Sequence, residues 1–231
     1  FDKDKVDCWD YNKNKLTPRH VVKNSNKTYW FICNVCNHGF CDSLNHIVSK
    51  KKRWCPFCSN HQLCNNNCQI CFNKSFASFD KDKVDCWDCN KNHNILPRDI
   101  FLQSNNKHWF VCNICNHSFK QQITVITNMG CWCPYCSNKL LCNIDTCLSC
   151  YDKSFASSNK AHFFDNDKNN EVNPRQIYKS SGKKYWFKCN DCNHSFECRL
   201  DNIYNGKWCP YCANKLLCNN NNCKICFDKS F

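Results

Sequence analysis

The stretch Cys33-Asn-Val-Cys36, followed in the chain by Cys55-Pro-Phe-Cys58, decides the fold of this protein. The same two motifs recur twice, as Cys112 and Cys115 with Cys133 and Cys136, and as Cys189 and Cys192 with Cys209 and Cys212. Two cysteines separated by two residues form a tight knuckle, and two such knuckles supply the four thiolates of a tetrahedral zinc site. The sequence therefore predicts three tandem four-cysteine zinc sites.

Cysteine accounts for 27 of the 231 residues, a density that indicates either metal ligation or a disulfide framework. Metal ligation is favoured because the count is odd and because cysteines two residues apart rarely bridge each other. Residues 1–10 are charged and do not resemble a signal peptide. We therefore expect reduced thiols and an intracellular, reducing compartment.

The composition also limits the partners. The formal net charge is +13, but each four-cysteine zinc site carries −2, so three sites leave about +7. This excess is moderately favourable for nucleic acid. The sequence holds no apolar run long enough to cross a membrane, so we expect no membrane partner.

Internal repetition organises the whole chain. Pro18, Pro97 and Pro174 recur with the cysteine motifs at intervals of about 77 residues, a clear repeat signature. We predict zinc repeats at residues 1–78, 79–157 and 158–231. Three whole repeats fill the chain, which we interpret as a segment of a longer array or as an array whose outer repeats lack neighbours.

The sequence of each repeat predicts a small set of secondary-structure elements. The segments 18–22, 97–101 and 174–178 begin with proline and are expected to form helical turns. The aromatic segments 29–32, 108–111 and 185–188 are expected to form strands that lead into the first knuckle. A return strand should follow, although Phe40, Leu44 and Ile47 fit helical spacing as well. The predicted fold class is small zinc-stabilised, β-rich α+β modules, resembling zinc ribbons or treble clefs.

A second cysteine cluster ends each repeat and predicts two or three further zinc sites, each with three thiolates. A closed zinc site needs a fourth ligand, and the next repeat offers Cys86 after the first cluster and His162 after the second. Such ligands would let zinc bridge successive repeats. The alternative is ligation inside one repeat, completed by Cys89 or water. The clusters are Cys64, Cys68 and Cys71; Cys142, Cys147 and Cys150; and Cys218, Cys223 and Cys226.

A histidine follows the first knuckle in every repeat, at His38, His117 and His194. Because four cysteines already complete the first site, we interpret these histidines as hydrogen-bonded to backbone carbonyls near the metal rather than as ligands. Four cysteines do not recur in all repeats and are expected to be free thiols, namely Cys41, Cys89, Cys131 and Cys198.

The motifs Ser-Phe-Ala-Ser, Asn-x-x-x-Pro-Arg, Tyr-Trp-Phe-x-Cys-x-x-Cys-x-His-Ser-Phe and Lys-Trp-Cys-Pro-Tyr-Cys carry a resemblance that spans nearly the whole chain. They resemble the probable zinc-ribbon domain that is repeated in proteins of giant DNA viruses. Single copies of that family accompany endonuclease-like domains in bacteria, so the resemblance implies a DNA-related role. It also implies the host cytoplasm, a viral factory or the virion as location.

Two functions remain open from the sequence. The first is non-specific binding of DNA or RNA through cations beside strand aromatics, the candidates being Arg19, Arg98, Arg175, Lys27, Lys107 and Lys184. The second is a structural or protein-interaction scaffold, which is favoured if the three arginines prove to be packed inside. A weaker alternative is a module that targets a nuclease supplied by another chain. We expect no enzyme and no small-molecule substrate, because no carboxylate recurs beside the cysteine clusters.

Overall fold

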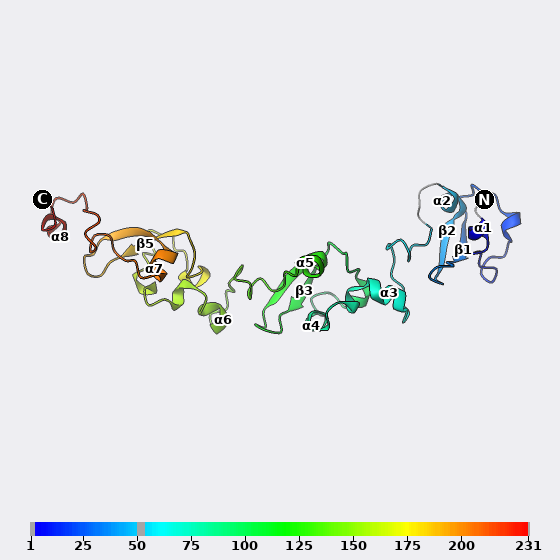
Figure 1. The fold of residues 1–231 in the computed structure, drawn as a ribbon, viewed down its shortest axis with the longest axis horizontal. Helices are drawn as coiled ribbons and strands as arrows, with labels where there is room; N and C mark the ends of the chain where they lie inside the picture. The colour runs from blue at the N-terminus through cyan, green and yellow to red at the C-terminus, as the bar shows by residue number, and fades with distance from the viewer. Residues whose placement is uncertain (1–2, 50–53, 231) are drawn as a thin grey trace. The chain divides into compact units, whose positions relative to one another are not determined.

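The computed structural model describes residues 3–49 and 54–230, and its internal contacts divide the chain into two compact units. One unit comprises Phe1–Asn113 with Ser118–Cys131, and the other comprises Ile114–His117 with Trp132–Phe231. The same order of elements recurs along the colour gradient of Figure 1, where each β-hairpin is followed by a short helix.

Within residues 3–49 and 54–230, the sheets are three two-stranded antiparallel hairpins, as the sequence predicted. Strand β1 (Thr28–Ile32) pairs with β2 (Gly39–Ser43), β3 (Lys107–Val111) with β4 (Ser118–Gln122), and β5 (Lys184–Lys188) with β6 (Ser195–Arg199). The register places Phe31 opposite Phe40, and the equivalent phenylalanines face each other in the other two hairpins. Side chains alternate along a strand, so Phe31 is buried while its neighbour Trp30 is 37% exposed.

A short helix follows each hairpin. It resolves whether Phe40, Leu44 and Ile47 belong to a strand or to a helix. Phe40 belongs to the return strand, whereas Leu44 and Ile47 are the buried residues of the helix α2 (Leu44–Val48). The helix is N-capped by Ser43, whose hydroxyl accepts a hydrogen bond from the His46 amide at 3.2 Å. The equivalent helices are α5 (Ile123–Met129) and α7 (Leu200–Tyr204).

The expected proline turns are 3₁₀-helices, η1 (Pro18–His20), η3 (Pro97–Asp99) and η6 (Pro174–Gln176). Three more short helices begin directly after the middle cysteine of each second cluster, namely α3 (Gln69–Lys74), α6 (Leu148–Tyr151) and α8 (Lys224–Phe227). The remaining short helices are α1 (Lys3–Val6), η2 (Phe76–Ser78), α4 (Lys81–Val84), η4 (Phe155–Ser157) and η5 (Ala161–Phe163).

The core of each repeat is a small aromatic cluster rather than an aliphatic one. In the first repeat the Phe31 ring lies 5.5 Å from Trp9, 5.7 Å from Phe40 and 5.4 Å from Trp54. An asparagine side chain extends the hairpin, because Asn14 accepts from the Trp30 amide and donates to the Trp30 carbonyl. No helix among the described residues has the length and apolar character that crossing a membrane would need.

The segments after the second clusters of the first and second repeats pack into the repeat that follows each of them. The Phe76 ring is fully buried, 5.8 Å from the rings of Trp87 and Phe110, which belong to the second repeat. Phe155 is equally buried in the core of the third repeat, 5.7 Å from Phe187. The cores of the second and third repeats are therefore each completed by a phenylalanine from the preceding repeat.

Candidate metal centres

The four cysteines of each first site are brought together as predicted. Cys33 and Cys58 place their Sγ atoms 3.7 Å apart, and Cys36 and Cys55 place theirs 3.5 Å apart. A disulfide would require about 2.05 Å, whereas Zn–S bonds of about 2.3 Å set the edge of a tetrahedron at roughly 3.8 Å. The sulfurs therefore have the spacing of zinc ligands.

The other two repeats reproduce this arrangement. Cys189 and Cys212 are 3.7 Å apart and Cys192 and Cys209 are 3.5 Å apart, measured between Sγ atoms. All four ligand atoms lie within 4.8 Å of one another in each of the sets Cys33, Cys36, Cys55 and Cys58; Cys112, Cys115, Cys133 and Cys136; and Cys189, Cys192, Cys209 and Cys212. The three predicted four-cysteine sites are confirmed as zinc-compatible clusters.

Asparagine shapes the backbone of the first knuckle. Asn37, directly after Cys36, has a φ of 54°, and the equivalent Asn116 and Asn193 have values of 55° and 54°. Asparagine tolerates this left-handed conformation better than most residues. The turn lets the Asn37 amide donate to the Cys33 carbonyl at 2.8 Å, so the recurrent Cys-Asn-His sequence has a conformational cause.

The first knuckle favours the thiolate that zinc requires at its first cysteine, whereas burial raises the pKa of Cys55 and Cys58 in the second knuckle of the same site. Burial by itself raises the pKa of the Cys33 thiol, but the backbone amides of Cys36 and Val35 and the neighbouring cysteine side chains outweigh it, and the pKa falls below its ordinary value. The pKa of Cys189 is lowered in the same way, with the amides of Cys192 and Asp191 opposing burial.

The fourth candidate ligand beside each second cluster is the histidine that follows the first knuckle. His117 Nε2 lies 3.4 Å from Cys147 Sγ and 3.5 Å from Cys150 Sγ. His194 Nε2 lies 3.4 Å from Cys223 Sγ and 3.5 Å from Cys226 Sγ, and His38 Nε2 lies 3.5 Å from Cys71 Sγ. His38 with Cys64, Cys68 and Cys71, and His117 with Cys142, Cys147 and Cys150, form compact four-ligand sets.

Two sequence interpretations are therefore corrected. The histidines are candidate ligands rather than partners of backbone carbonyls, because their Nε2 atoms face the thiols. Cys86 and His162 are not the fourth ligands: Cys86 Sγ donates to the Asp82 carbonyl at 3.1 Å, and the exposed His162 ring lies against Phe163 at 3.8 Å. The expected zinc bridge between successive repeats is replaced by ligation inside one repeat.

A signal for this ligand was present in the sequence. The histidine recurs at one distance from the first knuckle in all three repeats, whereas Cys86 and His162 differ in residue type and in position. The ligand role of the histidine was missed because the histidine and the cysteines that it contacts are about 30 residues apart in the chain, and only the fold brings them together.

The two sites of a repeat are tied to each other through the Cys-Pro-x-Cys motif. Its third residue, Phe57, Tyr135 or Tyr211, stacks on the ligand histidine with centroids 4.2–4.3 Å apart. The carbonyl of the same residue accepts from a lysine that follows the second cluster, at 2.7 Å for Lys74 and 2.8 Å for Lys153 and Lys229. These contacts hold the second cluster against the first knuckle.

The arginines of the proline turns contact the second cluster of the preceding repeat. Arg175 is buried, and its Nη2 donates to the carbonyls of Ile144 at 3.0 Å and Cys147 at 2.8 Å. Arg98 Nη2 donates to the carbonyls of Asn66 and Cys68 at 3.2 and 3.3 Å. Arg175 is thus engaged inside the protein, which corrects its assignment as a nucleic-acid contact, and Arg98 is half-buried and hydrogen-bonded to the preceding cluster. Arg19 is exposed.

The charge of Arg175 also acts on the second cluster. Burial raises the pKa of the Cys147 thiol, but the Cys150 amide, the neighbouring cysteines and the Arg175 guanidinium together bring it below its ordinary value. In the first repeat, burial is likewise opposed, chiefly by a hydrogen bond from His38 and by the Asn66 amide, and the pKa of Cys64 falls to about 6. Both effects favour the thiolate form.

A family model described as a probable treble clef zinc finger domain matches residues 6–61, 84–139 and 161–215, once in each repeat. The chain belongs to this family. Each treble clef match contains one first knuckle, one hairpin and one Cys-Pro-x-Cys motif, and ends before the second cluster. The giant-virus resemblance is supported by an uncharacterized protein of Acanthamoeba polyphaga mimivirus, which is 36% identical over 181 residues, or 75% of this chain. The chain spans 42% of that relative's length.

Zinc binding by these treble clef repeats changes the electrostatic balance. Counted as thiolates around Zn²⁺, a four-cysteine site carries −2 and a three-cysteine, one-histidine site carries −1. Three sites of each kind lower the formal charge from +13 to about +4. The basic excess that favoured nucleic acid is therefore small.

Proposed function

We propose that this protein is a zinc-dependent structural scaffold in which the second zinc site of one treble clef repeat docks the next repeat. The arginine contact carries this proposal. Arg175 crosses from the proline turn of the third repeat to the carbonyls of the knuckle at Cys147, and Arg98 makes the equivalent contact one repeat earlier. Of the three arginines whose packing would favour a scaffold over a nucleic-acid surface, Arg175 is buried and Arg98 is half-buried, whereas Arg19 is exposed.

Two further features support a structural role. A β-bridge joins Ser154 to Tyr178, and another joins Ser75 to Phe101, beside the buried Phe155 and Phe76. Four protein donors at each cluster leave no open coordination position of the kind that catalytic zinc keeps. A reducing compartment belongs to the same proposal, because zinc ligation requires unoxidised thiols.

The scaffold proposal predicts that Arg175→Ala loosens the contact between the second cluster and the third repeat. Buried charge-assisted hydrogen bonds contribute on the order of 1.5–3 kcal/mol, so exchange of the Phe155 and Lys179 amides should accelerate by about tenfold or more. The Phe155 amide donates a hydrogen bond to the Ile177 carbonyl, and the Lys179 amide donates one to the Lys153 carbonyl, so both hydrogen bonds cross the contact. Hydrogen exchange followed by NMR measures the effect.

Arg199→Ala is the matched control, because Arg199 is an exposed arginine paired with Asp201 within its own repeat. It should leave both amides unchanged. Equal protection in Arg175→Ala and the wild type, at unchanged zinc content, would contradict docking through the second zinc site.

Nucleic-acid binding remains a second candidate because a lysine covers the outward-facing tryptophan in every hairpin. Nζ of Lys13 lies 4.2 Å from the Trp30 ring centroid, and the equivalent distances are 4.9 Å for Lys91 with Trp109 and 4.7 Å for Lys168 with Trp186. A cation beside a partly exposed aromatic ring suits phosphate contact with base stacking. Lys27, Lys107 and Lys184 are exposed at or beside the strand starts, although Lys184 is 3.7 Å from Glu197.

Under this second candidate, fluorescence anisotropy should show single-stranded DNA binding that weakens steeply between about 50 and 200 mM salt. The triple variant Lys13→Glu, Lys91→Glu and Lys168→Glu should lose it, because it reverses the charge beside each tryptophan. Charge reversal at Lys3, Lys81 and Lys224, which lie on the short helices α1, α4 and α8, provides a control of equal net charge. No binding at the lower salt, or equal loss in both triple variants, rejects this candidate.

A further inference from the structure

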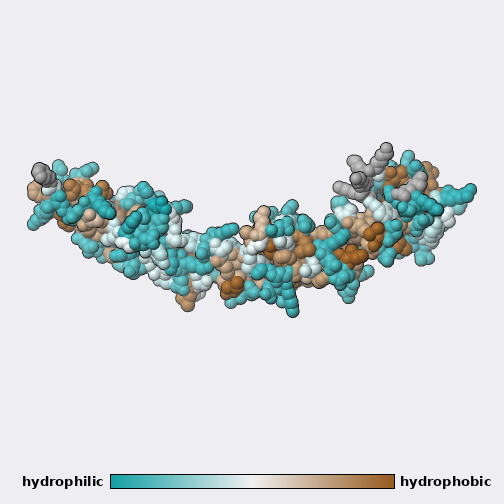
Figure 2. Space-filling view, viewed as in Figure 1, coloured by the Kyte–Doolittle hydropathy of each residue, from teal (hydrophilic) through white to brown (hydrophobic). Residues whose placement is uncertain are grey.

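Arg175 is a buried cation without a carboxylate partner. Hydrophilic side chains cover much of the surface in Figure 2, whereas the Arg175 side chain is 7% exposed. Its Nη2 atom donates to the carbonyls of Ile144 and Cys147, but its Nε and Nη1 atoms are buried and make no hydrogen bond. No salt bridge among the described residues includes Arg175. A buried charge is costly unless an opposite charge compensates it, so this guanidinium needs a counter-charge close by.

Arg98 repeats this pattern in the second repeat. Its Nη1 atom is buried without a hydrogen bond, and no carboxylate pairs with it in the part of the chain that the structure describes. Besides the carbonyls of Asn66 and Cys68, its Nη2 atom donates to Cys64 Sγ at 3.7 Å. The guanidinium therefore contacts a candidate ligand thiol of the preceding repeat directly.

A zinc-loaded second cluster supplies the counter-charge that both arginines lack. Three thiolates and one neutral imidazole around Zn²⁺ carry a net charge of −1. Zinc binds cysteine only as the thiolate, so a loaded cluster always carries this charge. The arginine also holds the knuckle carbonyls of the same cluster in place. Metal binding and the arginine contact therefore favour each other.

We propose that Arg98 and Arg175 couple zinc binding at the preceding second cluster to docking of the repeat that carries them. Each arginine is a positioning residue for its neighbour's metal site, because it acts through thiolates and knuckle carbonyls and is not itself a ligand. Coupling of this kind is reciprocal. Loss of the second-site zinc loosens the next repeat, and undocking of that repeat weakens zinc binding. The inference rests on the proposed function, because it adds metal-dependent control to the same docking.

Thiol alkylation in zinc-buffered solutions tests the effect of the arginine on zinc binding. The reagent labels cysteines that hold no metal, and peptide mass spectrometry reports the protection of Cys147 and Cys150. Arg175→Met removes the charge at similar side-chain length, and should raise the free zinc concentration that half-protects these cysteines by about tenfold. Protection of Cys209, in the four-cysteine site, reports that the third repeat stays folded.

Arg175→Lys separates charge from packing. It keeps the positive charge and should bind the second-site zinc more tightly than Arg175→Met. A role limited to packing predicts the reverse order, because an uncharged side chain is easier to bury than an ammonium group.

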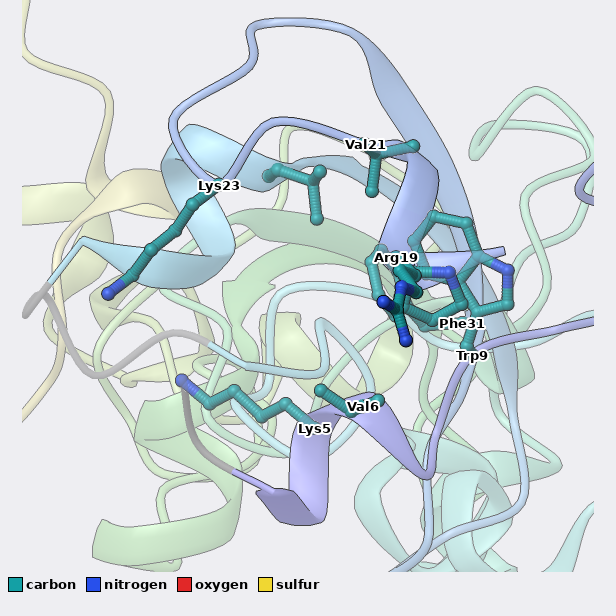
Figure 3. Close-up of a pocket in the computed structure, with 9 residues that line it drawn as sticks. Lys5, Val6, Trp9, Arg19, Val21, Lys23 and Phe31 are labelled. Carbon is teal, nitrogen blue, oxygen red and sulfur yellow. The ribbon is translucent and has the colours of Figure 1, made fainter. Parts of the chain in front are cut away.

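Other sites of the same molecule serve as references. Protection of Cys68, in the cluster that Arg98 contacts, should shift in Arg98→Met and stay unchanged in Arg175→Met. Arg19 occupies the equivalent position in the first repeat and lies beside Phe31 in Figure 3, in a pocket that no candidate ligand lines. Arg19→Met should therefore leave the zinc protection of every cluster as it is in the wild type.

Amide exchange tests the effect of zinc on docking. At a chelator concentration at which His117→Ala has lost the second-site zinc, exchange of the Phe155 and Lys179 amides should accelerate although Arg175 is intact. In the double variant with Arg175→Met, the free-energy effects should fall short of their sum, because both changes remove the same pair of charges.

Equal zinc midpoints in the wild type and Arg175→Met, tighter binding in Arg175→Met than in Arg175→Lys, or additive effects in the double variant would each overturn the coupling. Docking is judged separately, by exchange of the same two amides in Arg175→Ala with every site loaded. Faster exchange there, combined with unchanged zinc midpoints, would retain the scaffold and reject the coupling alone.

Discussion

Removal of zinc is expected to unfold all three repeats. The aromatic core of a repeat is small, and several of its most buried side chains are ligand cysteines such as Cys33, Cys55 and Cys71. A structural zinc ion contributes on the order of 10 kcal/mol or more in zinc-finger peptides, which exceeds what so small a core supplies. A strong chelator in the presence of a thiol-free reductant should abolish the dispersed amide NMR spectrum and the protection of the hairpin amides.

Readdition of zinc provides the control, since the reductant keeps the cysteines from forming disulfides and the spectrum should return. Native mass spectrometry should find six zinc ions in the loaded chain, one for each compact ligand cluster. A folded chain that contains no metal, or masses that indicate paired cysteines in place of bound ions, would falsify the zinc-based account of the fold.

Replacing the ligand histidine is expected to have the second largest effect. His117→Ala removes one of four donors from the cluster with Cys142, Cys147 and Cys150, so the zinc count should fall from six to five at moderate chelator concentration. A cluster of three thiolates lacks the closed coordination of a structural site. Native mass spectrometry during a chelator titration measures the change.

His117→Cys should restore the sixth zinc ion, because a thiolate can replace the imidazole as donor. The matched controls are His162→Ala and Cys86→Ala, at the two positions that sequence reasoning assigned to this role. Both should leave six ions bound. Loss of zinc in His162→Ala with full retention in His117→Ala would return the fourth ligand to the next repeat and contradict the ligation inside one repeat.

The sequence by itself determined the local parts of this protein. The repeat period is visible directly in the sequence. The four-cysteine sites, the hairpins and the proline turns follow from short motifs that recur in every repeat, and each was predicted. Cys33 and Cys36 form a knuckle because two residues separate them, whatever surrounds them. The spacing pattern also indicated a second cluster of three thiolates that required one more donor.

The tertiary structure alone decided which residues complete those parts across longer distances. It placed His117 rather than His162 beside Cys150, because the hairpin returns the chain over the second cluster. It turned Arg175 from a predicted surface cation into a buried donor to the Cys147 carbonyl, since β-bridging at Tyr178 brings the proline turn against the preceding knuckle. Sequence separation does not reveal such pairings, because the histidine contact depends on how the chain folds back inside one repeat and the arginine contact depends on how one repeat packs against its neighbour.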